Sequence, residues 1–405
     1  MKKFVSLTLC TVFLFALAAC GGKEASPSQP ASQPVTIVPP AESASASLPY
    51  EEPVELERAF LTGLEKGPDY PEGKRITAVM VNNISSSRPT RGLSECQVLV
   101  EIKVEGGITR FMALYEDYEK IPEIGSVRSA RDQFFQLLLP FWGFYVHDGQ
   151  SQMMNQFLKD WDYGGFDLSA GKYGLSSGGP ADGLLAWRDP ARRAAGFPTE
   201  YTEYTDGAHI AQTIQNNNLD DHREYGSPMF NFVPYNEPPR VPTGGPMPEL
   251  AVIHSSSYIT QFSYSNGKYL MNQFNSSRGV VEPTIDENAD GAQVSFDNLI
   301  VLFAPMSLYG DTPLVKVDYM GGGGYYFSQG HYEFLIWQKG GPNQALQLYM
   351  GDKSENPVFI NPGNTYLAVV DDNMLPDFDS AMKSGNAGQV AAGGEVNQNE
   401  TETED

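Results

Sequence analysis

Cysteine, basic residues and long apolar runs are all scarce in this chain of 405 residues. Cys10 and Cys20 lie in an N-terminal leader, which leaves Cys96 alone and predicts no disulfide in the folded part. Only 27 Lys and Arg face 50 Asp and Glu, and this net charge of -23 argues against nucleic acid as a partner. After the leader, no apolar run approaches the ~20 residues of a membrane span. The five histidines show no metal-ligand spacing.

The first twenty residues read as an export signal. Lys2 and Lys3 precede an apolar run over 4–17, and small residues follow it. Leu17-Ala18-Ala19-Cys20 matches a bacterial lipobox, in which the diacylated Cys20 becomes the first residue of the mature chain. An ordinary signal peptide with an incidental cysteine is the alternative. The lipobox predicts a chain anchored by Cys20 to the bilayer, at the extracytoplasmic face of the cell membrane.

Composition divides the rest of the chain into four segments. A Ser/Pro/Ala-rich stretch over 21–54 is predicted to be a disordered tether, and an acidic stretch over 379–405 a disordered tail. Between them we predict a mixed strand and helix domain over 55–235 and a β-rich domain over 248–378, joined by a Pro/Gly-rich connection. The fold class expected is a layered, β-rich α+β fold.

Alternating apolar residues predict three strands early in the first domain, over 76–83, 96–104 and 109–115. The Gly106-Gly107 pair between the last two is typical of a hairpin turn. In the second domain, alternation over about 250–372 predicts eight or so short strands in predominantly antiparallel sheets.

Two helices are expected in the first domain. Ser129 is a suitable N-cap for the first, and Pro140 should end or bend it. The second is predicted over 208–216, with Asp206 near its N-terminus.

Six motifs occur in a specific order: RPTRGLSECQVLVEIKVEGGITRFMALY (88–115), IGSVRSARDQFFQ (124–136), VHDGQS (146–151), DNLIVLF (297–303), GGGGYYFSQGHYEFLIWQK (321–339) and FINPGNTYLAVV (359–370). In these motifs the chain resembles the YerB-like lipoprotein family, a domain-of-unknown-function family with N- and C-terminal halves. The resemblance covers residues 73–372 and implies an extracytoplasmic lipoprotein with a layered fold of sheets and helices. It supplies no catalytic residues. The chain departs from the family at Cys96-Gln97, where Ala-Asp is usual.

Charged and titratable side chains gather on or beside the strands and the first helix of the first domain: Glu105, Arg110, Arg128, Arg131, His147 and Asp148. Guanidinium forks at a helix N-terminus favour anions, so we predict a site for a phosphate, pyrophosphate or carboxylate. The alternative is structural: Glu105 pairs with Arg110, and the other arginines hold loops. Convergence on one open cleft would favour the ligand site, and burial in separate ion pairs would favour the structural role.

Two nucleophile candidates have simpler interpretations. Ser151 follows His147 closely but lacks the G-x-S-x-G elbow, and His147 at a strand end is expected to be structural. Cys96 in an apolar strand is expected to be a small buried side chain.

A calcium loop is a further hypothesis. Asp286, Asn288, Asp290 and Asp297 fit the alternating oxygen ligands of such loops, with Gly291 at the turn. Asp, Asn and Gly are equally typical of a hairpin turn, so both alternatives stand.

The glycine and aromatic run that begins at Gly321 has no following Lys-Ser/Thr, so it is not a P-loop. Four glycines here should bend a strand or let two backbones approach. The aromatic residues could form a sugar-stacking platform or pack a core: Tyr325, Tyr326, Phe327, Tyr332 and Trp337.

Together these patterns favour a lipid-anchored binding or scaffold protein for an envelope ligand or a partner protein, with no cofactor beyond the calcium hypothesis. Two alternatives remain: an enzyme that acts on an anionic, phosphate-linked envelope substrate, and a carbohydrate-binding module.

Overall fold

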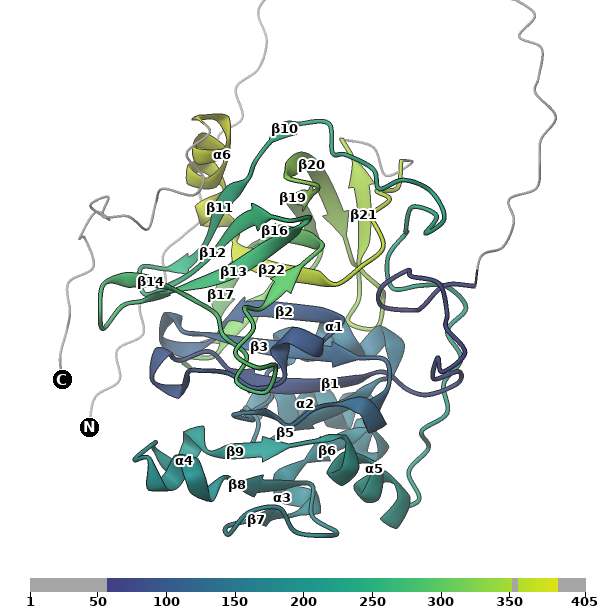
Figure 1. Cartoon of the computed structure of the whole chain (residues 1–405), viewed down its shortest axis with the longest axis vertical. Helices are drawn as coiled ribbons and strands as arrows, with labels where there is room; N and C mark the ends of the chain where they lie inside the picture. The colour runs from purple at the N-terminus through teal and green to yellow at the C-terminus, as the bar shows by residue number, and fades with distance from the viewer. Residues whose placement is uncertain (1–56, 352–355, 385–405) are drawn as a thin grey trace, which may run out of the picture. The chain divides into compact units, whose positions relative to one another are not determined.

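A computed structural model describes residues 57–351 and 356–384 of the chain (Figure 1). The predicted anchor Cys20, the tether over 21–54 and most of the predicted tail lie outside the described residues. None of the helices within the described ranges is long and apolar enough to cross a membrane.

One eleven-stranded sheet runs through the molecule, in the order β10-β20-β19-β16-β22-β2-β3-β1-β5-β6, with β21 beside β20. The first half of the chain contributes β1 (Thr77–Asn82), β2 (Val98–Lys103), β3 (Thr109–Tyr115), β5 (Phe144–His147) and β6 (Asp167–Ser169). The second half contributes β10 (Gly245–Pro246), β16 (Asn298–Ala304), β19 (Gly321–Ser328), β20 (His331–Gln338), β21 (Gln347–Met350) and β22 (Thr365–Asp371).

Strand β22 joins the two halves. It lies between β2 and β16 and runs parallel to both, with Thr365 paired to Val98 on one side and to Asn298 on the other (Figure 1). The two segments that we predict as domains therefore share one sheet in the folded chain. That residues 55–235 and residues 248–378 form two separate domains stays a prediction.

Three smaller sheets complete the fold. The first half forms a four-stranded sheet from β4 (Ile124–Gly125), β7 (Leu175–Ser176), β8 (Ala186–Arg188) and β9 (Glu203–Thr205). The second half forms an antiparallel sheet from β11 (Glu249–Ser255), β12 (Tyr258–Ser265), β13 (Lys268–Asn275), β14 (Val280–Pro283) and β15 (Ser295–Phe296), and a pair from β17 (Met306–Leu308) and β18 (Val315–Val317). Mixed sheets in the first half and antiparallel sheets in the second confirm the α+β class.

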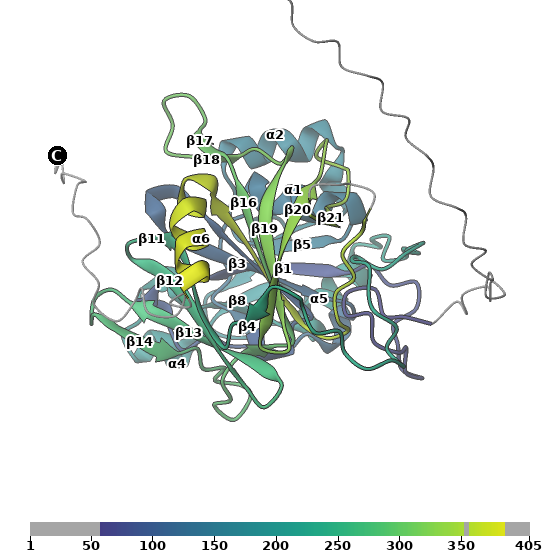
Figure 2. The same ribbon diagram turned by 90° about the horizontal axis from the view of Figure 1, so that it is seen from above.

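Both faces of the large sheet are buried, as the alternation along β16 shows. Ile300 and Leu302 pack into one core, and Leu299 and Val301 pack into the other. Six helices are described: α1 (Asp132–Leu138), α2 (Gln152–Asp160), α3 (Ala170–Tyr173), α4 (Pro190–Ala194), α5 (Gly207–Asn216) and α6 (Leu375–Ser384). α1 and α2 supply the first core, and α5 and α6 lie on the other side (Figure 2). The result is a layered molecule with the sheet in its middle.

The helix predicted from Ser129 begins later. Its N-cap is Arg131, no side chain caps it, and its first residue is Asp132. The prediction of Ser129 as the N-cap is therefore wrong, because residues 128–131 pair with strand and loop backbone instead: the Ala130 N–H donates to Gly149 O at 2.9 Å. Pro140 does follow the end of α1, inside a short 3-10 turn.

Two local predictions are confirmed. Asp206 is the N-cap of α5 and accepts a hydrogen bond from the His209 N–H. The glycines of β19 permit a close approach of strands, since a Cβ on Gly324 would lie 2.7 Å from the carbonyl oxygen of Val301.

Candidate functional site

Three of the predicted site arginines meet at the carboxyl ends of β1 and β5. These strands are parallel and end at Asn82 and His147. Arg110 on β3 pairs with Asn82, and the backbone of Arg128 bonds to β1 and to the Asp148 N–H. Ligands of open α/β sheets commonly bind outside the carboxyl ends of parallel strands. The sheet therefore places Arg110, Arg128 and Asp148 where such a site is expected.

Glu105 pairs with Arg131. The Arg131 fork donates from Nε to Oε1 at 2.6 Å and from Nη2 to Oε2 at 3.0 Å. Burial alone would raise the pKa of Glu105, but the hydrogen bond and charge of Arg131 outweigh it and lower that pKa. The structural alternative, in which Glu105 pairs with Arg110, is wrong about the partner, because η3 (Glu105–Gly107) aims its carboxylate at Arg131.

Arg110 is the most deeply buried of the three arginines. Its side chain is 5% exposed, and Nη1 donates to the carbonyl oxygen of Ser129 at 2.6 Å. Within the described residues, no carboxylate lies within the 4.0 Å of an ion pair. Burial and the charges of Arg131 and Arg128 lower the pKa of Arg110 to about 9, although Glu105 opposes the shift. At neutral pH it remains charged, so the fold holds an uncompensated cation here.

Arg128 is held loosely. Nη1 donates to Glu200 O at 3.3 Å, and the guanidinium lies 5.9 Å from the centre of the Tyr201 ring. Its Nε is buried and has no hydrogen-bond partner in the described part of the chain. A guanidinium presents a fixed fork of donors, so Arg128 has unused capacity for an anion.

Arg188 and Glu203 complete the group, and sequence reasoning missed both. Glu203 is 1% exposed, and burial, followed by the neighbouring Asp148, raises its pKa to about 9 although Arg188 lies 3.1 Å away. No motif marks these two residues; only the pairing of β8 with β9 puts them opposite each other. The following residues are called the arginine cluster: Arg110, Arg128, Arg131, Arg188, Glu105, Asp148 and Glu203.

The arginine cluster carries excess positive charge. With Glu203 protonated at neutral pH, four arginines face only two other acidic side chains, Glu105 and Asp148, so basic groups outnumber acidic ones. The α1 terminus adds little, because α1 is only seven residues long and starts beyond Arg128. The anion preference therefore comes from side chains and not from a helix dipole.

His147 does not join the arginine cluster. Its ring is fully buried, with Nε2 2.7 Å from Asp167 Oδ1 and Nδ1 2.9 Å from the carbonyl oxygen of Gly149. Ser151 caps α2 through the Met154 N–H. Because both His147 nitrogens are engaged, neither is free to act as a base for Ser151, and this geometry agrees with the structural interpretation of His147.

Cys96 is fully buried, and its thiol donates to Leu93 O. Burial, followed by the charge of Asp286, raises the pKa of this thiol, which keeps it protonated and unreactive. The expectation of a small buried side chain is confirmed.

The four candidate calcium ligands serve separate partners. Asp286 is 1% exposed and accepts from the N–H groups of Gly92 and Ser94, while Asp297 bonds Lys268 and the Asn364 N–H. Asn288 donates its side-chain amide to Glu123 O, and Asp290 sits at a positive φ of 51°. Among the described residues, no group of three or more His, Cys, Asp or Glu could hold a metal ion. Calcium binding at this loop stays a prediction, without a preformed ligand set in its support.

The aromatic residues of β19 and β20 pack the core. Tyr326, Phe327 and Trp337 are at most 1% exposed, Tyr325 is 6% exposed, and Tyr332 is partly buried. The Trp337 Nε1–H donates to Phe303 O at 3.1 Å. These rings offer no open face for sugar stacking, which agrees with the core interpretation.

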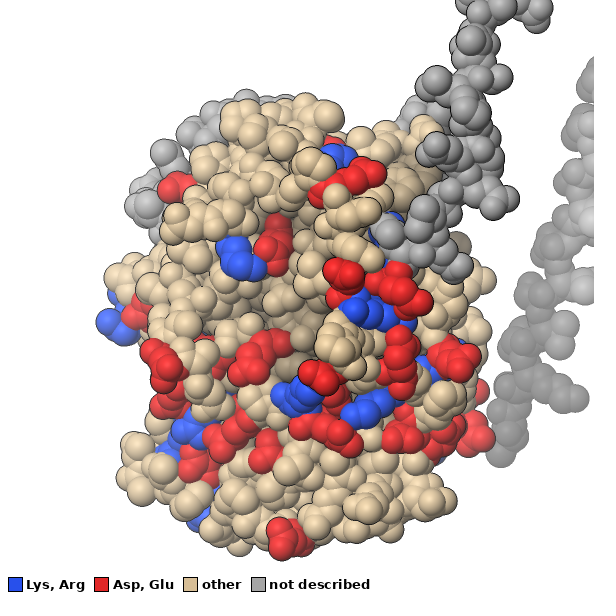
Figure 3. Space-filling model, turned by 45° about the vertical axis from the view of Figure 1, so that its right-hand side comes forward, with Lys and Arg blue, Asp and Glu red and all other residues tan. Residues whose placement is uncertain are grey.

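A second group of arginines has abundant acid partners. Arg91 donates to Glu123, to Asp189 at 2.7 Å and to Glu287 at 2.6 Å, and Arg192 donates to Glu287 at 2.8 Å. We call these five residues the acid-matched cluster. On the face shown in Figure 3, blue basic side chains lie beside red acidic ones, as expected for an acidic protein.

Comparisons with known proteins match both halves of the chain. Residues 61–220 match the family model described as "Protein of unknown function (DUF3048) N-terminal domain", and residues 250–367 match the corresponding C-terminal domain. A protein of Bacillus subtilis (strain 168) named "Putative lipoprotein YerB" is 26% identical over 391 residues, which is 95% of this chain and 98% of that protein. The crystal structure of the YerB protein from Bacillus subtilis has a similar fold, with a TM-score of 0.63 and 23% identity over 78% of this chain and 97% of that one.

Proposed function

Because this chain belongs to the DUF3048 family, which is characterised by sequence and fold but not by activity, we propose its function from the site: it is a lipid-anchored binding protein of the cell envelope. The arginine cluster binds an anionic group of an envelope ligand, such as a phosphate, a pyrophosphate or a carboxylate. Cys20 carries the lipid anchor and holds the chain at the extracytoplasmic face of the membrane. The lipoprotein name of the Bacillus relative supports the anchor.

The uncompensated charge of the arginine cluster carries this proposal. A chain of net charge -23 has carboxylates to spare, yet Arg110 and Arg128 have none within ion-pair distance in the described ranges. Keeping buried cations unpaired costs folding free energy. An anion that accepts from Arg110 and Arg128 would remove this cost, so binding and stability are coupled at this site.

Binding is favoured over catalysis because the group closest to a catalytic base, His147, is already engaged on both nitrogens. A carbohydrate-binding role built on the C-terminal aromatic residues has weaker support, since Tyr326, Phe327 and Trp337 are core residues.

The test replaces two arginine guanidinium groups, each of which presents a fork of hydrogen-bond donors, by lysine ammonium groups, which act as point charges. In the double variant Arg110→Lys and Arg128→Lys, the charge stays but bidentate contact with the anion is lost, so pyrophosphate should bind at least about tenfold more weakly. Titration calorimetry on the detergent-solubilised, full-length protein measures the affinity, and urea unfolding measures the stability. Arg193→Lys is the matched control, because Arg193 is exposed and bonds only to Ser177 O in the described chain.

Weaker pyrophosphate binding with an unchanged unfolding midpoint would support the site. Absence of binding of phosphate, pyrophosphate and acetate to the wild-type protein, at concentrations up to about 10 mM, would overturn it. In that case, a large fall in the unfolding midpoint of the double variant would assign these arginines to the scaffold.

The anchor has its own test. Cys20→Ser removes the thiol that is acylated, so the mature chain should leave the membrane fraction or remain unprocessed. If the variant still partitions with detergent-extracted lipoproteins, the lipobox interpretation fails while the arginine cluster is unaffected.

A further inference from the structure

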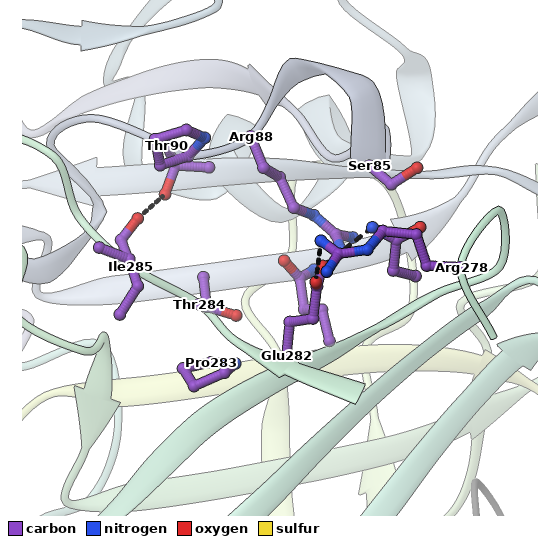
Figure 4. Close-up of a pocket in the computed structure, with 11 residues that line it drawn as sticks. Ser85, Arg88, Thr90, Arg278, Glu282, Pro283, Thr284 and Ile285 are labelled. Carbon is purple, nitrogen blue, oxygen red and sulfur yellow. Dashed lines mark hydrogen bonds and ion pairs between the residues drawn. The ribbon is translucent and has the colours of Figure 1, made fainter. Parts of the chain in front are cut away.

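A pocket of about 320 Å³ opens between the two halves of the chain, and no residue of the arginine cluster lines it (Figure 4). One wall is the loop that follows β1 and contains Ser85, Arg88 and Thr90, and the other is formed by β13, β14 and the segment after them. Thr90 Oγ1 donates to Ile285 O at 3.2 Å and ties the two walls together at one end. This volume lies within the range of small-molecule sites, about 300–1,000 Å³.

The Gln273 side chain offers a buried, unused acceptor to this pocket. Its orientation is fixed by a chain of hydrogen bonds that starts at the fully buried carboxylate of Glu101. Since Glu101 only accepts, Asn83 must donate its Nδ2 to it, at 3.0 Å, and turn its Oδ1 toward Gln273. Gln273 in turn donates Nε2 to that oxygen, which leaves its Oε1 without a partner among the described residues.

Asn275 repeats this arrangement two residues along the same strand, and therefore on the same face. Its Nδ2 donates to the carboxylate of Glu282 at 2.9 Å, so its Oδ1 is the free atom. Thr284 adds a hydroxyl that likewise lacks a partner in the described ranges. Gln273, Asn275 and Thr284 are 2%, 8% and 3% exposed. Unsatisfied polar atoms at such depth are unusual, and together they call for a ligand that donates hydrogen bonds.

Arg88 requires a ligand group that accepts hydrogen bonds, because it is a donor. Its Nε is buried without a partner, its other contacts are long, at 3.3–3.4 Å, and no carboxylate forms an ion pair with it in the described structure. Burial lowers the pKa of Arg88, although Glu101 and Glu282 partly oppose this. At the rim, Arg278 and Glu282 pair and cancel each other's charge (Figure 4). The pocket therefore holds one positive charge without a direct partner.

We propose that this pocket binds a small, hydroxyl-rich monoanion of the acidic-sugar class. Its anionic group accepts from Arg88, and its hydroxyl groups donate to Gln273 and Asn275 and bond with Thr284. Hydroxyl groups fit the two amide oxygens better than an ammonium group does, because an ammonium group would face the charge of Arg88. Carboxylate and phosphate sugars share this chemistry.

The ligand class is tested with four probes on the detergent-solubilised, full-length protein. Glucuronate and glucose 6-phosphate carry an anionic group and hydroxyl groups, glucose carries hydroxyl groups only, and acetate carries the charge only. We expect one of the two acidic sugars to bind at least about tenfold more tightly than glucose and acetate in calorimetry. The tighter of the two identifies the anionic group.

Thr284→Val is the sharpest variant. Its hydroxyl has no partner inside the described chain, so exchanging it for a methyl group should leave the unfolding midpoint unchanged or raised. Loss of the ligand's hydrogen bond should weaken acidic-sugar binding about three- to tenfold. Arg88→Gln should weaken it more strongly, and the exposed control Arg193→Gln should not change it.

Failure of both acidic sugars to bind at about 10 mM, or binding that neither Arg88→Gln nor Thr284→Val weakens, would overturn the proposal. The outcome is independent of the arginine cluster. The double variant Arg110→Lys and Arg128→Lys should retain acidic-sugar binding, and Arg88→Gln should retain pyrophosphate binding.

Discussion

The arginine cluster and the acid-matched cluster use the same side chain in opposite ways. In the acid-matched cluster, Arg91 donates to three carboxylates and lies 4.7 Å from the centre of the Tyr204 ring. Burial would lower the pKa of Arg91, but the hydrogen bonds that it donates to its acid partners, to Glu287 first, raise it. In the arginine cluster, Arg110 is more deeply buried, at 5% exposed, and its pKa falls to about 9.

The arginines of the two clusters differ in their acid partners, and this difference separates a structural role from a binding role. Arg91 connects Glu123 and Asp189 of the first half with Glu287 of the second, so it holds the fold together. Arg110 and Arg128 form no comparable ion pair in the described structure, and the charge of Arg128 helps to lower the pKa of Arg110. A buried arginine is therefore evidence for a binding site only when its acid partners are missing.

The largest effect is expected from breaking the acid-matched cluster. Arg91→Ala leaves Asp189, which is 10% exposed, without its cation and removes one of the two arginine links to Glu287. We expect a loss of about 2–4 kcal/mol in unfolding free energy, below the full value for a buried pair because Glu123 and Glu287 are partly exposed. Urea unfolding measures this. A loss below about 1 kcal/mol would remove the contrast between the clusters.

The pH dependence of the unfolding free energy tests whether Glu203 is protonated in the arginine cluster. Its pKa is raised to about 9 in the folded chain from its ordinary value of 4.5, so between these values the folded state binds up to one proton more than the unfolded state. Stability should therefore fall as pH rises through this window, by an amount on the order of 2 kcal/mol from about pH 5 to 8. Glu203→Gln, which cannot ionise, should flatten this slope in urea unfolding. The same slope in both proteins would show that Glu203 is ionised in the folded state.

Arg110→Met should raise the unfolding free energy, whereas Arg91→Ala should lower it. Methionine keeps much of the buried volume and removes the repulsion from Arg131 and Arg128, at the expense of one hydrogen bond to Ser129 O. We expect a gain of about 1 kcal/mol in unfolding free energy in the absence of ligand. A loss of stability in thermal and urea unfolding would place Arg110 among the structural arginines.

The smallest effect on stability is expected at Arg128. Its side chain makes one hydrogen bond within the described residues, the 3.3 Å contact to Glu200 O, so Arg128→Gln should change the unfolding free energy by less than about 0.5 kcal/mol. The same variant should weaken pyrophosphate binding. A large stability change with intact binding would reverse the roles assigned to the two clusters.

Local sequence was enough for much of the fold. Period-two alternation predicted β1, β2, β3 and most strands of the second half, because such alternation reflects burial on the pleated faces of a strand. The glycine pair before β3 and Asp206 before α5 act on their nearest neighbours only, and both behaved as predicted. The six ordered motifs were enough to identify the family, since motif order is also a property of the sequence.

Only the tertiary structure decided which residues come together in the two candidate sites. Nothing in the local pattern shows that β22 inserts between β2 and β16, that Arg131 and not Arg110 takes Glu105, or that Gln273 meets Asn83 190 positions away. Ser129 has the composition of an N-cap, but strand pairing of its neighbours moved the start of α1 to Asp132. Propensities act over a few residues, whereas the charge balance around an arginine depends on which distant carboxylates the packed chain brings within 4 Å.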